Sequence, residues 1–233
     1  MSLYIPAHFS VPERAAIARL LHDHSFATLV TPVSPEPLVT HLPLIYFADC
    51  EPHGTLLGHF ARANPHAKSA AMAESIAIFH GPHAYVSPSW YVEPATAVPT
   101  WNYAVVHAHG TLELAHDPAE TRAIIDAMIH RFESGRDVPW RPGLERERLD
   151  ALVNAIVGFR MKVKRIDAKF KLSQNRSPED RARVAQALDA EGYAEAGATA
   201  AWMRAYGYAG SGSIFPDTSS PNEEPDDQRK SRA

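Results

Sequence analysis

Cysteine is almost absent from the chain, because Cys50 is the single thiol among 233 residues. One thiol can form neither an intrachain disulfide nor a thiolate metal cluster. Cys50 stands in the polar stretch 49–52, and no histidine follows it in a recognisable catalytic motif. We therefore interpret this cysteine as a bystander rather than as a nucleophile.

Long apolar segments are also missing. The chain has no run of about 18 uncharged apolar residues, and it does not begin with a basic region followed by an apolar stretch. The sequence thus predicts neither a membrane span nor a signal peptide, and we expect a cytoplasmic protein with no membrane partner. A hydrophobic content of 45% is sufficient for one substantial core, so we expect one main domain with appendages.

Glycine-rich nucleotide loops and an excess of positive charge are lacking too. Neither GxGxxG nor GxxxxGK[ST] occurs, which argues against ATP, GTP or Rossmann-type NAD binding. The net charge is −4, and without residues 216–233 the chain still holds 22 acidic against 20 basic residues. Such a composition gives no general attraction to nucleic acid, so a DNA-binding role would need a local basic patch.

What the sequence does contain is a series of β-branched and apolar runs of strand length. Strands are predicted at residues 26–31, 38–47, 56–60, 76–80, 100–114 and 159–172. The run 100–114 alternates over the longest span, which indicates a strand with two distinct faces. In 159–172 the apolar residues change parity near Lys164 and Arg165, which predicts a bulge there. Because helices interrupt these strands in no regular alternation, the pattern favours an antiparallel barrel over a doubly wound sheet.

Helix-start signals divide the strands. Helices are predicted from a capping box at Ser10 to about His24, from Asn64–Pro65, from Asp117 to before Gly135, over 144–157, from Ser177 to about Glu191, and around Trp202. We expect residues 1–176 to form the barrel domain with inserted helices and residues 177–207 to form a C-terminal helical segment. Residues 208–233 are rich in Gly, Ser, Pro and acid, and we expect a disordered tail.

The first candidate site lies where a predicted strand leads into a helix start, in residues 57–68. Arg62 and Lys68 fall near free backbone amides there, which is a plausible phosphate site. A capped helix carrying two solvated cations is the alternative.

The second candidate is the single basic stripe of the chain. Residues 159–176 carry seven Lys or Arg against one acid, Asp167. A solvated strand face would explain the stripe. Its end, 169–176, nevertheless places amide and hydroxyl donors beside the cations, which suits a phosphate or the edge of a heteroaromatic ring.

Histidines and aromatic residues supply weaker signals. The pairs His80/His83 and His107/His109 have spacings that suit a metal, but no nearby acid or cysteine completes a recognisable set. We therefore expect structural or ligand-pocket histidines and no metal site. Segments 87–91 and 99–103 gather aromatics and hydroxyls next to prolines, and they suit either the wall of a pocket for a flat ligand or a dimer interface.

Seven motifs occur in order along the chain. They are YIPAHF (4–9), FATLVT (26–31), THLPL (40–44), GHFARANPHAK (58–68), GPHAYVSPSWY (81–91), VPTWNYAVVHAHG (98–110) and KFKLSQNR (169–176). Together they resemble the PaiB family of FMN-binding negative transcriptional regulators, which is similar to the pyridoxamine-phosphate-oxidase-like flavoproteins. The resemblance implies a mainly β (α+β) fold: a six-stranded antiparallel split β-barrel with flanking and C-terminal helices. It also implies a homodimer that binds FMN in clefts built from both subunits.

The resemblance assigns site residues as well. Residues expected along the isoalloxazine are Thr40, His41, Leu42 and Pro43. Residues expected at the phosphate are Arg62, Asn64 and Lys68. The motif that contains them also places His59 in the cofactor site. Residues expected from the other subunit are Trp101, Asn102, Lys169, Lys171, Ser173 and Gln174. No catalytic residue and no metal ligand are predicted.

Three functions follow from this reading. The first is an FMN-binding regulatory protein of the PaiB type. The alternatives are a flavin-dependent oxidoreductase acting on a small aromatic or polyamine-related substrate, and a haem-binding split barrel. The family resemblance also implies DNA contact, for which the predicted helix from Ser177 offers Arg181 and Arg183. No helix-turn-helix pattern occurs, however, and packing of this helix on the barrel is the competing interpretation.

Overall fold

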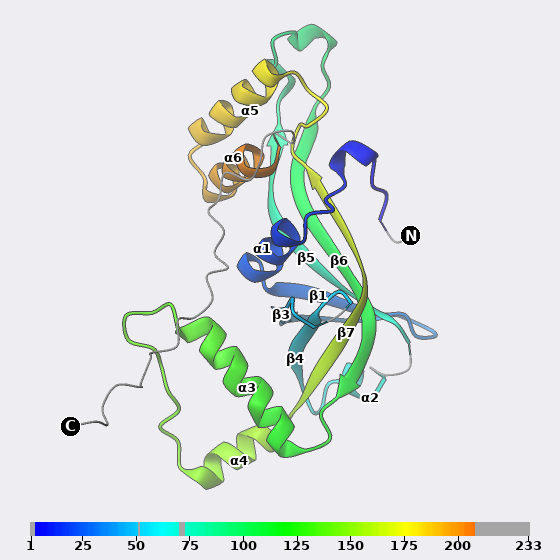
Figure 1. Ribbon diagram of the computed structural model, residues 1–233, viewed down its shortest axis with the longest axis vertical. Helices are drawn as coiled ribbons and strands as arrows, with labels where there is room; N and C mark the ends of the chain where they lie inside the picture. The colour runs from blue at the N-terminus through cyan, green and yellow to red at the C-terminus, as the bar shows by residue number, and fades with distance from the viewer. Residues whose placement is uncertain (1–2, 51, 70–72, 208–233) are drawn as a thin grey trace, which may run out of the picture.

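The computed structural model describes residues 3–50, 52–69 and 73–207 (Figure 1). Seven strands form one antiparallel sheet in the order β2-β1-β5-β6-β7-β4-β3. The strands are β1 Phe26–Thr31, β2 Leu38–Pro43, β3 Ile45–Phe47, β4 Thr55–Ala61, β5 Ser75–Val86, β6 Thr100–Leu114 and β7 Ile156–Lys171. β2 and β3 are the two edges of the sheet, yet Leu44 alone separates them in the chain. The sheet must therefore curl until its edges meet, which makes it a barrel.

The predicted antiparallel β fold is confirmed, with seven strands instead of six. The predicted strand 38–47 is divided at Leu44, and this division supplies the seventh strand. β5 also extends to Val86, beyond the predicted end at residue 80. A register shift between His80 and His83 admits Pro82 to a strand that a proline would otherwise interrupt.

The longest strand behaves as its alternation predicts. Alternate residues from Asn102 to Ala108 on β6 face the core, and the opposite set faces outward. The predicted bulge is also present, since His109 pairs with Arg165 while Gly110 pairs with Val163. Lys164 is the extra residue, so the change of apolar parity in β7 is a true structural signal.

In the described ranges, six α-helices and three 3-10 turns precede, join or follow the strands. They are α1 Arg14–Asp23, α2 Pro65–Ser69, α3 Pro118–Glu133, α4 Arg146–Asn154, α5 Pro178–Ala190, α6 Ala194–Tyr206, η1 Ala7–Phe9, η2 Pro88–Trp90 and η3 Pro94–Thr96. Asp117 caps α3 and Ser177 caps α5, as predicted. The predicted capping box at Ser10 is wrong, because Ser10 forms a β-bridge with Lys169 and α1 begins only at Arg14.

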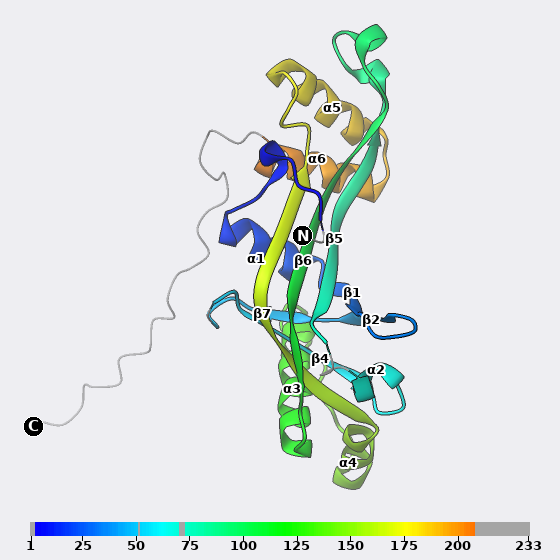
Figure 2. The same ribbon diagram turned by 90° about the vertical axis from the view of Figure 1, so that its right-hand side faces the viewer.

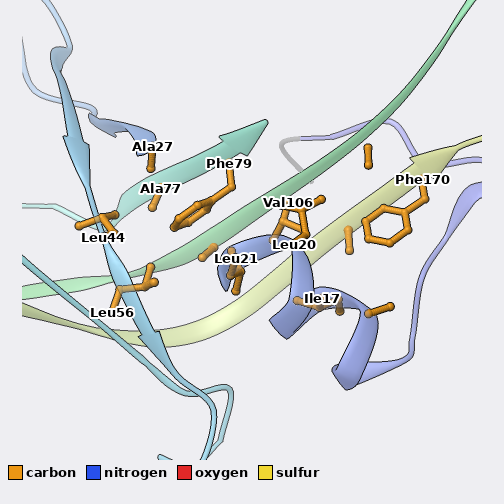
Figure 3. Packing of buried hydrophobic residues seen from close by; sticks show 14 of the residues in the cluster. Ile17, Leu20, Leu21, Ala27, Leu44, Leu56, Ala77, Phe79, Val106 and Phe170 are labelled. Carbon is orange, nitrogen blue, oxygen red and sulfur yellow. The ribbon is translucent and has the colours of Figure 1, made fainter. Parts of the chain in front are cut away.

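The main core lies between α1 and the sheet. Ile17, Leu20 and Leu21 of α1 gather with Phe79 and Phe170 (Figure 3). Buried residues of α5 and α6 extend the same cluster, so these helices share the core of the barrel. The division at residue 176 stays a prediction, and the expected tail 208–233 lies outside the described residues.

Helices leave one side of the sheet open. α3 packs beside β4 and β7, and α5 and α6 pack beside β5, whereas the described helices do not cover the outer face of β5, β6 and β7 (Figure 2). The described helices also include none that is long and apolar enough to cross a membrane.

Candidate functional site

A chain of polar side chains closes one end of the barrel, where α2 follows β4. His66 Nδ1 lies 2.9 Å from Thr40 Oγ1, and His66 Nε2 lies 2.7 Å from Thr31 Oγ1. Thr31 Oγ1 is in turn 2.5 Å from Ser75 Oγ, and Asn64 Nδ2 donates to Thr40 Oγ1 at 3.3 Å. Burial lowers the pKa of His66, so its ring is neutral at pH 7. The cluster is therefore a neutral hydrogen-bonded network that links two strands to α2.

The four residues predicted along the isoalloxazine lie in β2, and their side chains face two different sides. Leu42 is 5% exposed and shares the core-facing side with Thr40. His41 and Pro43 face the outer side, where Thr28 Oγ1 lies 3.0 Å from His41 Nδ1. A flat ring on the outer side of β2 would meet the side chains of His41 and Pro43, and only the backbone of the other two residues.

Arg62 is anchored to the junction between α4 and β7. Its Nε donates to the carbonyl of Asn154 at 2.6 Å, and its Nη2 donates to the carbonyl of Ile156 at 2.7 Å. These bonds fasten the end of β4 to the start of β7. The guanidinium thus has a structural task within its own chain, and its role in phosphate binding stays a prediction.

Asn64 and Lys68 lie at the two ends of α2. Asn64 Oδ1 accepts the backbone N–H of His66 at 2.9 Å, which confirms the predicted N-cap. Its amide also reaches Thr40, so the structure brings together two of the predicted residues. Lys68, in the last turn, is exposed.

His59 lies on a different side of β4. It pairs with Gly158 of β7, and a side chain at Gly158 would meet Thr121 and Ile124 of α3. His59 Nδ1 is buried and has no hydrogen-bond partner in the described part of the chain. Burial lowers the pKa of His59. The structure therefore places this histidine on the side covered by α3 and not beside Thr40.

The two lysines predicted in the cofactor site lie near the end of β7, on its outer face. Lys169 is 7% exposed, and its Nζ donates to the backbone carbonyl of Tyr4 at 3.0 Å. The ammonium also lies 5.4 Å from the ring centroid of Tyr103. Its surroundings are thus a carbonyl and aromatic faces.

Lys171 has a similar environment. Its Nζ donates to Thr100 Oγ1 at 2.7 Å and to the carbonyl of Trp101 at 2.6 Å. Burial lowers the pKa of Lys171, and the charges of Lys169 and Arg176 lower it further. Among the residues that the structure describes, no carboxylate lies within ion-pair distance of either lysine. The ion pairs of β7 belong to other residues: Arg160, Lys162, Lys164 and Arg165.

Three further predicted residues face inward and hold the strand ends. Asn102 is fully buried, and its Nδ2 donates to Ser173 Oγ at 2.9 Å and to the sulfur of Met203 at 3.2 Å. Ser173 has a φ of 67°, a left-handed turn that follows β7. Gln174 Nε2 donates to the carbonyl of Phe170 at 2.6 Å. Their donors are used within the chain, and this separates them from the outward-facing lysines.

The α2 cluster and Trp101 lie toward opposite ends of β6. Ser75, a member of the polar cluster, pairs with Gly110, whereas Tyr85 pairs with Trp101. Gly110 is nine positions after Trp101 in the chain, which at ~3.3 Å per residue is roughly 30 Å. α2 accordingly lies toward the lower end of the sheet, and the β5–β6 connection lies at the upper end (Figures 1 and 2). Lys169 lies between these two ends, since it pairs with Val105.

An acidic residue that the sequence reasoning missed lies beside the histidines of β6. His109 Nε2 is 3.1 Å from Asp167 Oδ2, and Arg165 pairs with the same carboxylate. Burial raises the pKa of Asp167, but the bond and charge of Arg165 and the proximity of His109 more than offset this and lower it. Asp167 is distant in the chain and comes beside His109 because β7 pairs with β6. Within the described chain, no group of three or more His, Cys, Asp or Glu could hold a metal.

His66 is the site residue that the sequence reasoning missed entirely. It stands inside the motif 58–68, but nothing local marks it. Its partners Thr31 and Thr40 come from β1 and β2, and Ser75, which contacts Thr31, comes from β5. The sequence signal that does exist is the N-cap pair Asn64–Pro65, which fixes the turn that carries His66.

Two hollows in the surface lie away from the predicted residues. One, of about 320 Å³, lies between α1, β3 and α3, and Leu21, Leu44 and Arg131 are among its lining residues. The other, of about 390 Å³, lies between α3 and α4 beside Arg122 and Asp150. None of the predicted cofactor residues lines either hollow, which agrees with a cofactor cleft that one chain alone does not complete.

Comparison with known proteins identifies the family. Residues 3–165 match the family described as "Putative FMN-binding domain". The protein named "Protease synthase and sporulation protein PAI 2" from Bacillus subtilis (strain 168) is 38% identical over 192 residues, which cover 81% of this chain and 90% of that protein. An uncharacterized protein of Emericella nidulans, AN0679, is 27% identical over 219 residues, covering 77% of this chain and 87% of its own length.

Solved structures show the same fold. The flavocytochrome Anf3 from Azotobacter vinelandii superimposes with a TM-score of 0.56 at 13% identity, covering 97% of this chain and 92% of its own. A FAD and haem binding protein from Mycobacterium smegmatis gives a TM-score of 0.55 at 18% identity, covering 74% and 78%. Likeness at these identities establishes the split-barrel fold alone.

The side chains that are present fit a flavin mononucleotide. Such a ligand needs a flat surface with hydrogen-bonding edges for its ring and cations for its phosphate. The outer side of β2 and the aromatic ring of Trp101 supply the first, and Lys68 at the exposed end of α2 supplies the second. The chain therefore belongs to the FMN-binding domain family, as a split-barrel protein of the PaiB type whose cofactor is FMN.

Proposed function

We propose that the protein works as a homodimer that holds one FMN at each of two sites between the subunits. The observation that supports this proposal is the distance of roughly 30 Å along β6 between Trp101 and Gly110, which pairs with Ser75 of the α2 cluster. A two-fold axis would place the α2 end of one subunit against the β6–β7 end of its partner. Each site would then receive both groups, one from each chain.

In this arrangement the α2 end binds the phosphate. Lys68 is exposed there, and Asn64 is held by the cap of α2. Arg62 lies at the same turn, although its guanidinium donates to the carbonyls of Asn154 and Ile156. Lys68 is accordingly the principal phosphate ligand in the proposal, and the ring lies along the outer side of β2.

We further infer that the protein is a regulator of the PaiB type that acts through its flavin. The relative from Bacillus subtilis, whose name refers to protease synthesis and sporulation, matches over most of both chains. The arginines of α5 argue against direct DNA contact by that helix. Arg181 donates to the carbonyl of Gly207 at 3.0 Å, and Arg183 donates to the carbonyl of Trp90 at 3.1 Å.

A flavin-dependent oxidoreductase is the second candidate function. The observation that favours it is the exposed ring of Trp101, which is 52% exposed and could contact a second small molecule. Flavin supplies the hydride chemistry in such enzymes, and the protein's part is to bind and orient the substrate. Haem binding, the third candidate, has less support because His109 is already bonded to Asp167.

Purification and titration test the cofactor and the assembly together. We expect a yellow protein whose apo form quenches FMN fluorescence on binding, and light scattering should give the mass of two chains. A colourless monomer that takes up no FMN would remove the proposal. Reduction of the bound flavin by candidate electron donors then distinguishes the oxidoreductase from the regulator. A haem titration without a Soret shift excludes haem binding. A gel shift at about 0.15 M salt tests direct DNA binding.

A further inference from the structure

The outward end of β7 has more positive charge than an FMN phosphate at the α2 end accounts for. Lys169 and Lys171 are two residues apart, so their side chains share one face. Lys169 is 7% exposed and Lys171 is half-buried, and neither has a carboxylate partner among the described residues. Charges taken out of water are normally paired, so this arrangement is costly without an anion.

The hydrogen bonds of the two lysines leave N–H donors for such an anion. An ammonium group has three N–H donors. Lys169 uses one on the carbonyl of Tyr4, and Lys171 uses two, on Thr100 and Trp101. The fixed carbonyl and hydroxyl partners hold both ammonium groups in place without neutralising them. An acid on α6, Glu195, pairs with His83 and not with either lysine.

Exposed aromatic side chains stand next to the lysines. Trp101 is 52% exposed and Tyr85 is 41% exposed, and their ring centroids lie 6.1 Å apart at 73°. They pair across β5 and β6, so they share a face, and Tyr103 on the same face pairs with Lys171. Large exposed aromatic rings beside fixed cations suit a flat molecule that carries an acidic group.

We propose that Lys169 and Lys171, with the wall formed by Trp101 and Tyr85, bind a second ligand, a small aromatic carboxylate or phosphate, next to the flavin. This inference rests on the proposed function, because it assumes that the one phosphate of FMN is held at the α2 end of the other subunit. Each site then receives two cationic clusters but only one phosphate. The lysines therefore hold the acidic group of the substrate or effector, and the aromatic wall holds its ring.

Calorimetric titration of the FMN-loaded protein tests the site with benzoate and phenyl phosphate as probes and benzylamine as the cationic control. We expect one of the two anions to bind and to perturb the flavin absorption band, and benzylamine to show no binding. A preference between benzoate and phenyl phosphate identifies the acidic group. No binding of either anion at millimolar concentration would overturn the inference.

Lys171→Met should weaken anion binding by about tenfold or more, the loss expected for a hydrogen bond to a charged group, and should weaken it more than it weakens FMN binding. Lys162→Met is the matched control, since Lys162 lies on the same strand, is exposed, and pairs with Glu113. Trp101→Leu should weaken the binding of benzoate. Equal anion binding by the Lys171 and Lys162 variants would overturn the inference.

The result also separates this inference from the proposed function. If Lys171→Met loses FMN and anion affinity in parallel, the lysines bind the flavin itself, and the second ligand is excluded while the FMN dimer stands. If the wild-type protein binds no FMN, the dimeric flavin site fails, and anion titration of the apo protein with the same variants still decides whether the lysines form an anion site.

Discussion

Lys68 is the residue on which the phosphate site depends most. It is exposed at the end of α2 and makes no contact that a truncation would disrupt in the described structure. Lys68→Ala should therefore weaken FMN binding by about 1.5–3 kcal/mol, the usual contribution of a hydrogen bond to a charged group, without lowering stability. Fluorescence titration of apo protein measures the loss, with Lys162→Ala as the control. Unchanged affinity would show that the phosphate lies elsewhere.

His66 gives the protein a predictable response to acid. Its pKa in the folded state is lowered by burial, so the unfolded chain takes up a proton more readily. Its contribution to stability is complete above the unfolded pKa of about 6.5 and is lost as the pH falls through the lower folded value. Each unit of difference corresponds to roughly 1.4 kcal/mol.

Urea unfolding at pH 7.5 and pH 5.5 checks this expectation. The wild-type protein should be less stable at the lower pH. Burial also lowers the pKa of His24, His59, His107 and His109, so the total slope has several sources. His66→Gln removes one of them and should make the loss smaller. A loss of the same size in the variant would show that the Thr31–His66–Thr40 network does not sense protons.

At the scale of elements, the pairing of β6 with β7 depends on a position without a side chain. A Cβ at Gly110 would lie 2.1 Å from the carbonyl oxygen of Lys162, which is backbone and cannot turn aside. Gly110→Ala should destabilise the fold by about 1–3 kcal/mol, as other overpacked positions do. Gly197→Ala is the control, because nothing lies within 4 Å of its Cβ in α6, and it should be neutral or slightly stabilising. Thermal unfolding that ranks the two variants alike would contradict this account.

Elements with a local signal could be predicted, and contacts between distant segments could not. The alternation of 100–114, the parity change at Lys164 and the caps at Asp117 and Ser177 all depend on neighbouring residues, and the structure has each of them. The helix start at Ser10 failed because a long-range bridge to Lys169 outweighed local capping. Likewise His109 meets Asp167 only through the register of two strands.

The candidate site follows the same division. The order of the motifs identified both groups of cofactor residues along the chain. It did not predict which face of its strand each side chain occupies. Ser173 follows two lysines in the sequence, yet it faces inward and contacts the buried Asn102, whereas Lys169 faces outward. The direction of each side chain is set by the twist of the sheet, by the bulge in β7 and by the left-handed residue Ser173. These features form only in the folded sheet.

At the scale of the whole molecule, the open face of the sheet is the natural surface for a second copy. Val39, Val30 and Ile76 pair across β2, β1 and β5 on this face, and Phe26 lies farther along β1. Phe26 is 66% exposed and Val39 is 52% exposed. Exposed apolar side chains grouped on one face typically mark an interface, and these lie on the same outer side of β2 and β1 as His41 and Pro43.

The assembly should therefore be required for cofactor binding. Val39→Lys places a charge in the patch without changing any predicted phosphate ligand. It should shift the protein toward monomer and lower FMN affinity at least tenfold at micromolar protein concentration. The affinity falls because each site would lose the residues that the partner supplies. Light scattering and FMN fluorescence, followed over a dilution series, should show the two losses at the same protein concentration. Val138→Lys is the control, since Val138 is 85% exposed in the connection between α3 and α4. A Val39→Lys monomer that keeps full FMN affinity would mean that one chain completes the site alone.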